Sequence, residues 1–323
     1  MYKRQGLTAY VMDTGIRADH VEFGGRVLAG FTTIVDGHGT DDCDGHGTGV
    51  ASTLGGATYG VAKAVTLVPV RVFDCDGNSS VSNITTALDW VLGDHADGTP
   101  GVLNMSFGGP TSNAIDDGVR AVIAEGIVAV AAAGNEGSNA CGGSPARVGG
   151  AITVAATDEI DFSPGWSSYG PCVDLFAPGV NVRSATDETT TSSELHDGTS
   201  FSAPHVAGAI AVLWADHPGL DGDAITAQLL GNATGDAVDN PGRNTPNRLL
   251  FSQPGPPAND AFSAAPALSL TDLASPDLTS PASGFVDGTN LLATEETGEP
   301  THAGVGGGRS VWWQFTATET GPM

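Results

Sequence analysis

Five short apolar runs limit the fold of this chain more than any other feature of its sequence. They are residues 7–13 (LTAYVMD), 65–72 (VTLVPVRV), 101–107 (GVLNMSF), 127–133 (IVAVAAA) and 151–157 (AITVAAT). None alternates strictly between apolar and polar residues, which is typical of strands buried on both faces. The segments between them carry helical patterns of apolar residues. The order predicts an α/β fold with a mostly parallel central sheet and helices on both faces.

A change in composition divides the rest of the chain. Residues 200–216 and 223–234 predict two helices that are rich in small side chains, and the Pro/Gly stretch 253–257 (QPGPP) is typical of a linker. We therefore expect one main domain over 6–252. Residues 258–323 are rich in Ser, Thr, Pro and Gly and predict an incomplete C-terminal β segment.

The charge balance excludes nucleic acid as a partner, and the hydropathy of the chain excludes a membrane-spanning helix. The chain has 12 Lys and Arg against 37 Asp and Glu, a net charge of −25. No basic stripe can therefore neutralise the phosphates of a nucleic acid. No run approaches the roughly 18 apolar residues of a membrane-spanning helix.

The four cysteines point to an oxidising compartment. Cys43, Cys75, Cys141 and Cys172 are an even number at nearly equal separations, which fits two sequential disulfides, although three pairings are possible. A zinc site is the alternative, but no CxxC pair occurs. Two disulfides predict a secreted, extracellular protein.

Three polar residues lie in glycine-flanked segments where catalytic side chains could gather. Asp13 ends the first apolar run, and ligands bind at the carboxyl edge of parallel sheets. His46 precedes a predicted helix that includes Val50, as a general base could. Ser200 begins another helix, whose free N–H groups favour negative charge. Taken singly, each has an ordinary alternative: a turn-forming aspartate, a solvated loop histidine and a helix N-cap.

Together, the segments AYVMDTGI, DGHGTGVAS and DGTSFSAPHVAG resemble the three signature motifs of the subtilisin-like serine proteases. Asp, His and Ser in this chain order is the arrangement known from subtilisin itself. The stretches VPVRVFDCDG, LNMSFGG, AAAGNEG, SPARVGGAITVAATD and CVDLFAPG resemble the proteinase K and aqualysin branch, over residues 7–252. The resemblance implies a subtilisin-like three-layer fold and a serine endopeptidase that hydrolyses polypeptides.

The resemblance also implies the roles of four residues. Ser200 would attack the peptide carbonyl, His46 would act as general base, and Asp13 would orient the imidazole. Asn135 matches the oxyanion-hole asparagine, which would act together with the Ser200 backbone N–H. The resemblance implies no cofactor for catalysis, and we expect a monomer.

The substrate is expected to bind as an added strand. The residues implied to contact it are Gly77, Asn78 and Ser79 on one side, Ser106, Phe107 and Gly108 on the other, and Ala132, Ala133 and Gly134 at the primary pocket. The small wall predicts broad specificity, with a preference for apolar or aromatic side chains at P1, the residue before the cleaved bond. Ser79 stands where the branch usually has glycine, so we expect its side chain to narrow the outer subsite.

The resemblance further implies a structural calcium ion and a disulfide pairing. Its calcium ligands map to the carbonyl oxygens of Gly149 and Ala151 and to the carboxylate of Asp174, and hard oxygen ligands suit calcium. Relatives often have proline at the position of Gly149. The implied disulfides are Cys43–Cys75 and Cys141–Cys172.

Some of the chain departs from the family pattern. Gly49 stands where relatives commonly have a histidine. Residues 1–5 (MYKRQ) match a translated sequencing adapter, so we expect them to be non-native, with the start of the peptidase domain and an inhibitory propeptide missing before residue 6. Residues 258–323 resemble a β-sandwich module of bacterial secreted proteins, which we expect to be truncated at its end.

The pentapeptide DGHGT occurs twice, at residues 36–40 and 44–48. This dense cluster favours one alternative function, metal binding by Asp36, His38, Asp41, Cys43, Asp44 and His46. A catalytically silent relative that serves as a binding module is the other. The second copy is followed by GVAS, a helix start like that of the family. We therefore assign the base to His46 and predict that His38 is a solvated near-copy.

Overall fold

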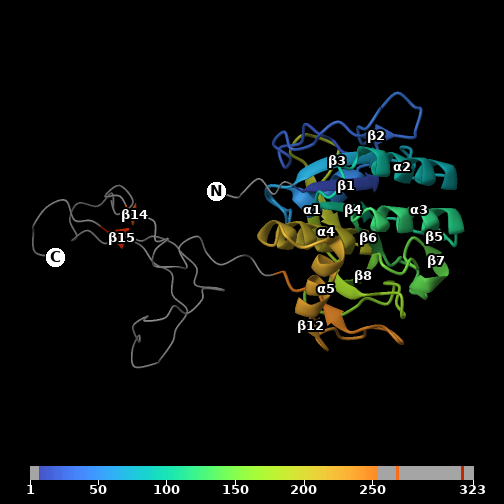
Figure 1. Cartoon of the computed structure of the whole chain (residues 1–323), viewed down its shortest axis with the longest axis vertical. Helices are drawn as coiled ribbons and strands as arrows, with labels where there is room; N and C mark the ends of the chain where they lie inside the picture. Colours follow the sequence, from blue (N-terminus) through green and yellow to red (C-terminus); the bar gives the residue numbers. More distant parts are fainter. Residues whose placement is uncertain (1–6, 253–266, 269–313, 316–323) are drawn as a thin grey trace, which may run out of the picture. The chain divides into compact units, whose positions relative to one another are not determined.

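The computed structural model describes residues 7–252, 267–268 and 314–315 (Figure 1). The chain divides into two compact units, Met1–Phe251 and Ser252–Met323. In the second unit the described residues are two short strands, β14 (Ala267–Leu268) and β15 (Gln314–Phe315), which pair in parallel. The predicted adapter residues, the linker and the rest of the β-sandwich module lie outside the described residues.

A nine-stranded sheet forms the centre of the first unit, in the order β12-β13-β9-β8-β6-β4-β1-β3-β2. Its strands are β1 (Thr8–Asp13), β2 (Phe31–Thr32), β3 (Thr66–Arg71), β4 (Gly101–Met105), β6 (Val128–Ala132), β8 (Ile152–Thr157), β9 (Leu175–Pro178), β12 (Thr234–Gly235) and β13 (Arg248–Leu249). Neighbours pair in parallel except β12 and β13. The predicted parallel sheet is confirmed, and the five apolar runs form five adjacent strands.

Helices cover both faces of the sheet and complete the predicted three layers (Figure 1). One face carries α1 (His46–Gly55), α4 (Thr199–Asp216) and α5 (Gly222–Asn232). The other carries α2 (Val81–Asp94) and α3 (Asn113–Ala124). Outside these layers lie a 3₁₀ turn, η1 (Ala140–Gly142), and two strand pairs, β5 (Gly109–Pro110) with β7 (Gly143–Ser144) and β10 (Val182–Ala185) with β11 (Ser193–His196).

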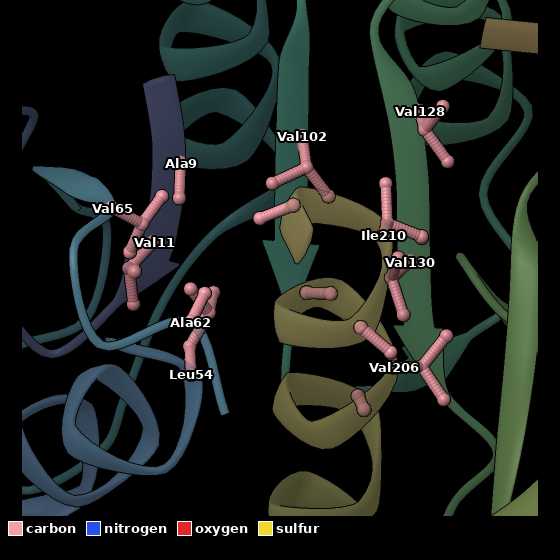
Figure 2. Close-up of a cluster of buried hydrophobic side chains, with 14 of the residues drawn as sticks. Ala9, Val11, Leu54, Ala62, Val65, Val102, Val128, Val130, Val206 and Ile210 are labelled. Carbon is pink, nitrogen blue, oxygen red and sulfur yellow. The ribbon is translucent and has the colours of Figure 1, made fainter. Parts of the chain in front are cut away.

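Each central strand buries both of its faces, which explains the missing alternation in the apolar runs. In β1, Ala9 and Val11 pack against α1 and α4, whereas Tyr10 and Met12 pack against α2 and α3. Figure 2 shows the first of these layers, with Val206 and Ile210 of α4 over the sheet. Each large apolar side chain buried in this way contributes about 1.5–3 kcal/mol.

The helices that carry the predicted base and nucleophile begin differently from the other long helices. Helices α2, α3 and α5 have side-chain N-caps, from Ser80, Ser112 and Asp221. Helices α1 and α4 begin after glycines, Gly45 and Gly198, with no side-chain cap. No side chain of the N-cap residue therefore covers their first N–H groups, which instead face side chains from other segments, such as Thr14 at α1 and Asn135 at α4.

The structure contains two disulfides, which join the pairs that the resemblance implies. Cys43 is bonded to Cys75 with an S–S distance of 2.02 Å, and Cys141 to Cys172 at 2.11 Å. Within the described residues no cysteine remains as a free thiol. Among the helices described, none has the length and apolar character needed to cross a membrane.

Candidate active site

Asp13 and His46 meet at the carboxyl edge of the sheet. Asp13 is the last residue of β1, and its side chain is 2% exposed, whereas that of His46 is 32% exposed. His46 Nδ1 lies 2.7 Å from Asp13 Oδ1, which also accepts a hydrogen bond from the Thr14 backbone N–H at 2.8 Å. With Nδ1–H directed at the carboxylate, the neutral ring has its free lone pair on Nε2. The pair is oriented to accept a proton at that atom.

Helix α1 approaches the end of β1 closely because Gly47 has no side chain. A Cβ atom at this position would lie 2.2 Å from the Gly15 carbonyl oxygen and 3.0 Å from Thr14 Oγ1. Instead, the Gly47 N–H donates to Thr14 Oγ1 at 2.8 Å. The glycine that follows His46 is therefore needed to hold the histidine against Asp13.

Asp42 joins the same two elements, a role that its sequence motif does not reveal. Its Oδ1 accepts from Thr14 Oγ1 at 2.9 Å and from the Gly45 N–H at 3.0 Å. Its Oδ2 accepts from the N–H and the hydroxyl of Thr48 at 2.8 and 2.7 Å. An aspartate just before a helix start is a known N-terminal signal and could have indicated this contact.

The acidic surroundings raise the pKa of His46. Burial alone would lower this pKa, but the carboxylates of Asp13, Asp44 and Asp42 outweigh that effect and raise it from 6.5 to about 9. Because the imidazolium is stabilised, the ring becomes a stronger base. The neutral form, which can accept a proton, accordingly forms at a higher pH.

Ser200 lies in the first turn of α4. The chain enters this turn through Gly198, whose φ of 150° is a conformation that side chains disfavour. Ser200 Oγ donates to the Ser106 carbonyl oxygen at 3.0 Å, and Ser106 Oγ donates to the Ser200 carbonyl oxygen at 2.6 Å. In this structure the Ser200 hydroxyl is thus bonded to Ser106 and not to His46, and it would have to rotate to form a hydrogen bond with His46.

Phe201 supports the imidazole from the other side, a contact that the sequence alone did not predict. Its ring meets the His46 ring edge-on, with centroids 5.7 Å apart. It also stacks on His196, with centroids 4.6 Å apart and planes at 18°. Phe201, the residue after Ser200, therefore limits the rotation of the His46 ring.

Asn135 is held by one end of its amide. Its Oδ1 accepts from both the N–H and the hydroxyl of Thr199 at 2.9 Å. Thr199 Oγ1 in turn accepts from the Gly134 N–H at 3.1 Å. These contacts use the amide oxygen of Asn135 and leave its Nδ2 donors for a ligand near Ser200.

A pocket of about 700 Å³ joins these groups. Its walls include Asp13, His46, Asn135 and Ser200 together with the predicted contact residues Gly77, Ser106, Phe107, Gly108, Ala132, Ala133 and Gly134. Glu136 and Asp44 also line it, and no lysine or arginine does. The small residues of the wall predict an apolar pocket. The sequence analysis did not identify Glu136 as a pocket residue, although Glu136 directly follows Asn135.

Two of the predicted contact residues do not line this pocket. Asn78 and Ser79 are not among the residues that line the pocket. Ser79 Oγ donates to the Val72 carbonyl oxygen at 2.5 Å, so its hydroxyl turns back onto its own segment. The narrowing of the outer subsite by the Ser79 side chain stays a prediction.

The three residues assigned to calcium lie on adjacent segments. Asp174 Oδ2 accepts from the Thr153 N–H at 2.8 Å, and the Asp174 N–H donates to the Thr153 carbonyl oxygen at 2.9 Å. Gly149 and Ala151, just before Thr153, form a β-bridge with each other. Burial raises the pKa of Asp174, against hydrogen bonding from Thr153. Carbonyl oxygens and a carboxylate are the type of donor set that fits a hard cation.

The geometry does not support the alternative metal site in the DGHGT doublet. Asp36, His38, Cys43 and Cys75 place one potential ligand atom each within 4.8 Å of the others. However, the two sulfurs are bonded to each other, and Asp36 is paired with Arg71. His46, from the same proposed set, is directed at Asp13.

Comparisons with known proteins identify the family of the chain. The profile of the subtilase family matches residues 4–253. An extracellular serine proteinase of Thermus sp. (strain Rt41A) is 47% identical over 247 residues, which cover 76% of this chain and 60% of the relative. Alkaline serine exoprotease A of Vibrio alginolyticus is 42% identical over 248 residues, 76% of this chain and 45% of the relative. The chain thus spans about half the length of these curated relatives.

A solved structure shares the fold. The crystal structure of a cold adapted subtilisin-like serine proteinase superposes with a TM-score of 0.74 at 41% identity, covering 77% of this chain and 89% of that one. The three-layer arrangement is accordingly a subtilisin-like fold. Since the family profile matches residues 4–253, which are most of the chain, the chain belongs to the subtilase family.

Proposed function

We propose that this chain is a secreted serine endopeptidase that hydrolyses peptide bonds with Asp13, His46 and Ser200. The observation that carries the proposal is the 2.7 Å contact between His46 Nδ1 and Asp13 Oδ1, beside a serine in an uncapped helix N-terminus of the same pocket. The extracellular relatives and the two disulfides support secretion. The reaction requires no cofactor, and its substrates are polypeptides.

The mechanism is acyl transfer to water. When substrate enters, Ser200 Oγ turns from Ser106 towards His46 Nε2 and attacks the peptide carbonyl carbon. His46 takes the hydroxyl proton and passes it to the leaving amine. Asp13 holds the ring tautomer and stabilises the imidazolium. Water then enters and gives a proton to His46 while its oxygen attacks the acyl carbon, and His46 returns that proton to Ser200 Oγ as the acyl group leaves as a carboxylic acid.

The oxyanion formed by the attack needs donors that are already in place. Asn135 Nδ2 is free because Thr199 holds Oδ1, and the Ser200 backbone N–H lies in the first turn of α4. The α4 dipole favours negative charge at the same point. The two donors come from different elements, and Thr199 couples them.

The pocket predicts which side chain lies at P1. Ala132, Ala133 and Gly134 provide a small wall that admits apolar and aromatic side chains with little discrimination. Glu136 adds a carboxylate to this pocket, so basic side chains are also accepted when they reach it. We propose broad specificity, with apolar and aromatic residues preferred and basic residues ahead of acidic ones.

The proposal is tested by digestion of an unfolded polypeptide. Purified protein is incubated with a reduced, alkylated substrate, and the new N-termini are identified by mass spectrometry, with Ser200→Ala as the blank. Cleavage mainly after apolar and aromatic residues is expected. Folded protein that produces no new N-termini above the blank contradicts the proposal.

The pH dependence of hydrolysis should reflect the raised pKa of His46. Since the base must be neutral, kcat/KM should rise with pH through that pKa, well above 6.5. Asp44→Asn removes one carboxylate that raises the pKa, so the rise should move to lower pH. The shift should shrink in 1 M salt, where charges are screened beyond about 3 Å.

The control for this measurement is Asp41→Asn. Asp41 is an exposed aspartate on the same loop, and it is not among the groups that shift the pKa of His46. Its pH profile should match that of the wild type. If Asp44→Asn also leaves the profile unchanged, the loop charges do not tune the base.

We also propose that Gly149, Ala151 and Asp174 hold a structural calcium ion. The ion would balance the charge of the half-buried Asp174 carboxylate and tie two loops together. Calcium at 100 times its Kd should add about 2.7 kcal/mol to the free energy of unfolding. Thermal unfolding in calcium and in chelator measures this gain.

Asp174→Asn should remove most of that calcium-dependent gain. Asp89→Asn, at an exposed position of α2, loses the same charge and should keep the gain. Equal unfolding temperatures for the wild type in calcium and in chelator would exclude the site.

A further inference from the structure

The side chain of Arg71, the last residue of β3, is fully buried next to the proposed catalytic dyad. In the sheet, Arg71 is in register with Asp13, and the following Val72 N–H donates to the Asp13 carbonyl oxygen at 2.9 Å. A buried guanidinium needs partners for five N–H donors, because leaving them unpaired is costly. Its partners show which parts of the molecule it connects.

The guanidinium reaches the strand end on one side and the first DGHGT copy on the other. Arg71 Nε donates to the Thr14 carbonyl oxygen at 2.9 Å. Its Nη1 and Nη2 bond the two carboxylate oxygens of Asp36 at 2.8 and 2.5 Å, and Nη1 also donates to the Gly39 carbonyl oxygen at 3.2 Å. The remaining donor faces the Cys43–Cys75 disulfide, with Nη2 3.1 Å from Cys43 Sγ.

Thr14 links this guanidinium to both members of the dyad. Its N–H donates to Asp13 Oδ1, and its hydroxyl accepts from the N–H of Gly47, next to His46. A carbonyl fixed by Arg71 therefore fixes a residue whose other groups hold Asp13 and the start of α1.

The loop of the first DGHGT copy is closed around the same strand end. The Ile16 N–H donates to the Thr40 carbonyl oxygen at 3.0 Å, and a Cβ on Gly15 would lie 2.8 Å from the Asp41 backbone. Asp36 Oδ1 also accepts from the His38 N–H at 3.0 Å. The Arg71 guanidinium, followed by the His38 N–H, holds the pKa of Asp36 well below its usual range, so the pair stays charged.

We propose that Arg71 and Asp36 form a positioning pair for the Asp13–His46 dyad, with the first DGHGT copy supplying the aspartate. The pair touches no substrate and acts through Thr14. It rests on the proposed function, since it requires the dyad to be catalytic. The two copies then have different tasks: the second contributes the histidine, and the first contributes Asp36, which holds the guanidinium in place.

Asp36→Asn tests the pair, because it keeps the shape of the side chain and removes the charge that holds Arg71. We expect kcat to fall by about tenfold or more with KM changed less than twofold, since small displacements of catalytic groups are costly. The rise of kcat/KM should also move to lower pH, because a looser contact with Asp13 raises the pKa of His46 less. Asp41→Asn, on the same loop but without a contact to Arg71, should leave both unchanged.

A second variant covers the case in which Asp36→Asn does not fold. Replacing both partners by apolar residues, Asp36→Leu with Arg71→Met, removes the ion pair without leaving the buried guanidinium as a lone charge, and such replacements are frequently tolerated. We expect this protein to fold and to show the same loss of kcat and the same pH shift. In Arg71→Lys, a single ammonium group replaces the planar guanidinium, which bonds both oxygens of Asp36. The kcat of this variant should lie above that of the double variant.

The outcomes separate this proposal from the proposed function. If wild-type Ser200 reacts with a fluorophosphonate while folded Asp36→Asn or the double variant keeps wild-type kcat and pH profile, the pair is only structural and the positioning role is wrong. If wild-type Ser200 does not react at all, the proposed function fails, and the positioning role fails with it.

Discussion

His46→Ala is expected to lower kcat by about 10⁶-fold, whereas His38→Ala, at the same position of the identical pentapeptide, should leave kcat within twofold. The first factor is the one known for the histidine of subtilisin, a member of this family. The expected loss is large because, in the proposed mechanism, Asp13, His46 and Ser200 act as one unit. His38 is exposed, and its backbone N–H, not its ring, contacts Asp36.

Steady-state hydrolysis of a chromogenic peptide measures both variants, with circular dichroism as the check on folding. Both substitutions remove an imidazole from an identical pentapeptide. A difference between them therefore reflects the position of the histidine in the fold and not its local sequence. Loss of activity in His38→Ala together with an active, folded His46→Ala would mean that the base lies in the first copy. That result would also remove the basis for the Asp13–His46 dyad.

Asn135→Ala should lower kcat by about 10²–10³-fold, or roughly 2.7–4 kcal/mol, while KM stays nearly constant. These values come from the corresponding asparagine of subtilisin. The loss falls on kcat because Nδ2 donates to an oxygen that is charged only in the transition state. Asn135 is exposed in the pocket, so its truncation should cost little stability.

Thr199→Val is the matched variant for this prediction. It removes the hydroxyl that donates to Asn135 Oδ1 and keeps the Thr199 N–H, so the amide is held less firmly but retains its donors. Its loss of kcat should be smaller than that of Asn135→Ala. A rise in KM at constant kcat in Asn135→Ala would place this side chain in ground-state binding and not in the oxyanion hole.

The strands that could be predicted are those whose environment is uniform. Residues 7–13 are apolar at almost every position because α1 and α4 cover one face of β1 and α2 and α3 cover the other. Strands β2, β12 and β13 have two residues each, and such short segments carry no periodicity. They exist because neighbouring strands offer them hydrogen-bond partners, which a local pattern does not record.

The start of α1 shows a second limit. The sequence predicts a helix that begins at Val50. The observed helix begins four residues earlier, at His46, within a glycine-rich segment of low helix propensity. Contacts from Asp42 and Thr14, which are brought together only by the fold, stabilise this first turn. Tertiary contacts outweigh local preference at the position of His46.

The candidate site also has residues that the sequence predicts and residues that only the fold reveals. Asp13, His46, Ser200 and Asn135 lie in motifs that could be recognised, and the fold brings them to one pocket. The residues that support them could not be found in this way. Asp36 and Arg71, for example, are separated by 35 residues and are recognisable as a pair only when β2, which precedes Asp36, lies beside β3.

Covalent labelling of Ser200 tests the proposed catalytic role of the Asp13–His46–Ser200 site most directly. The folded protein is treated with a fluorophosphonate, digested, and mapped by mass spectrometry, with His46→Ala and His38→Ala treated in parallel. We expect one label, on Ser200, in the wild type and in His38→Ala, and a rate lowered by orders of magnitude in His46→Ala. A folded wild-type protein that carries no label on Ser200, or an equal rate in His46→Ala, would contradict this role.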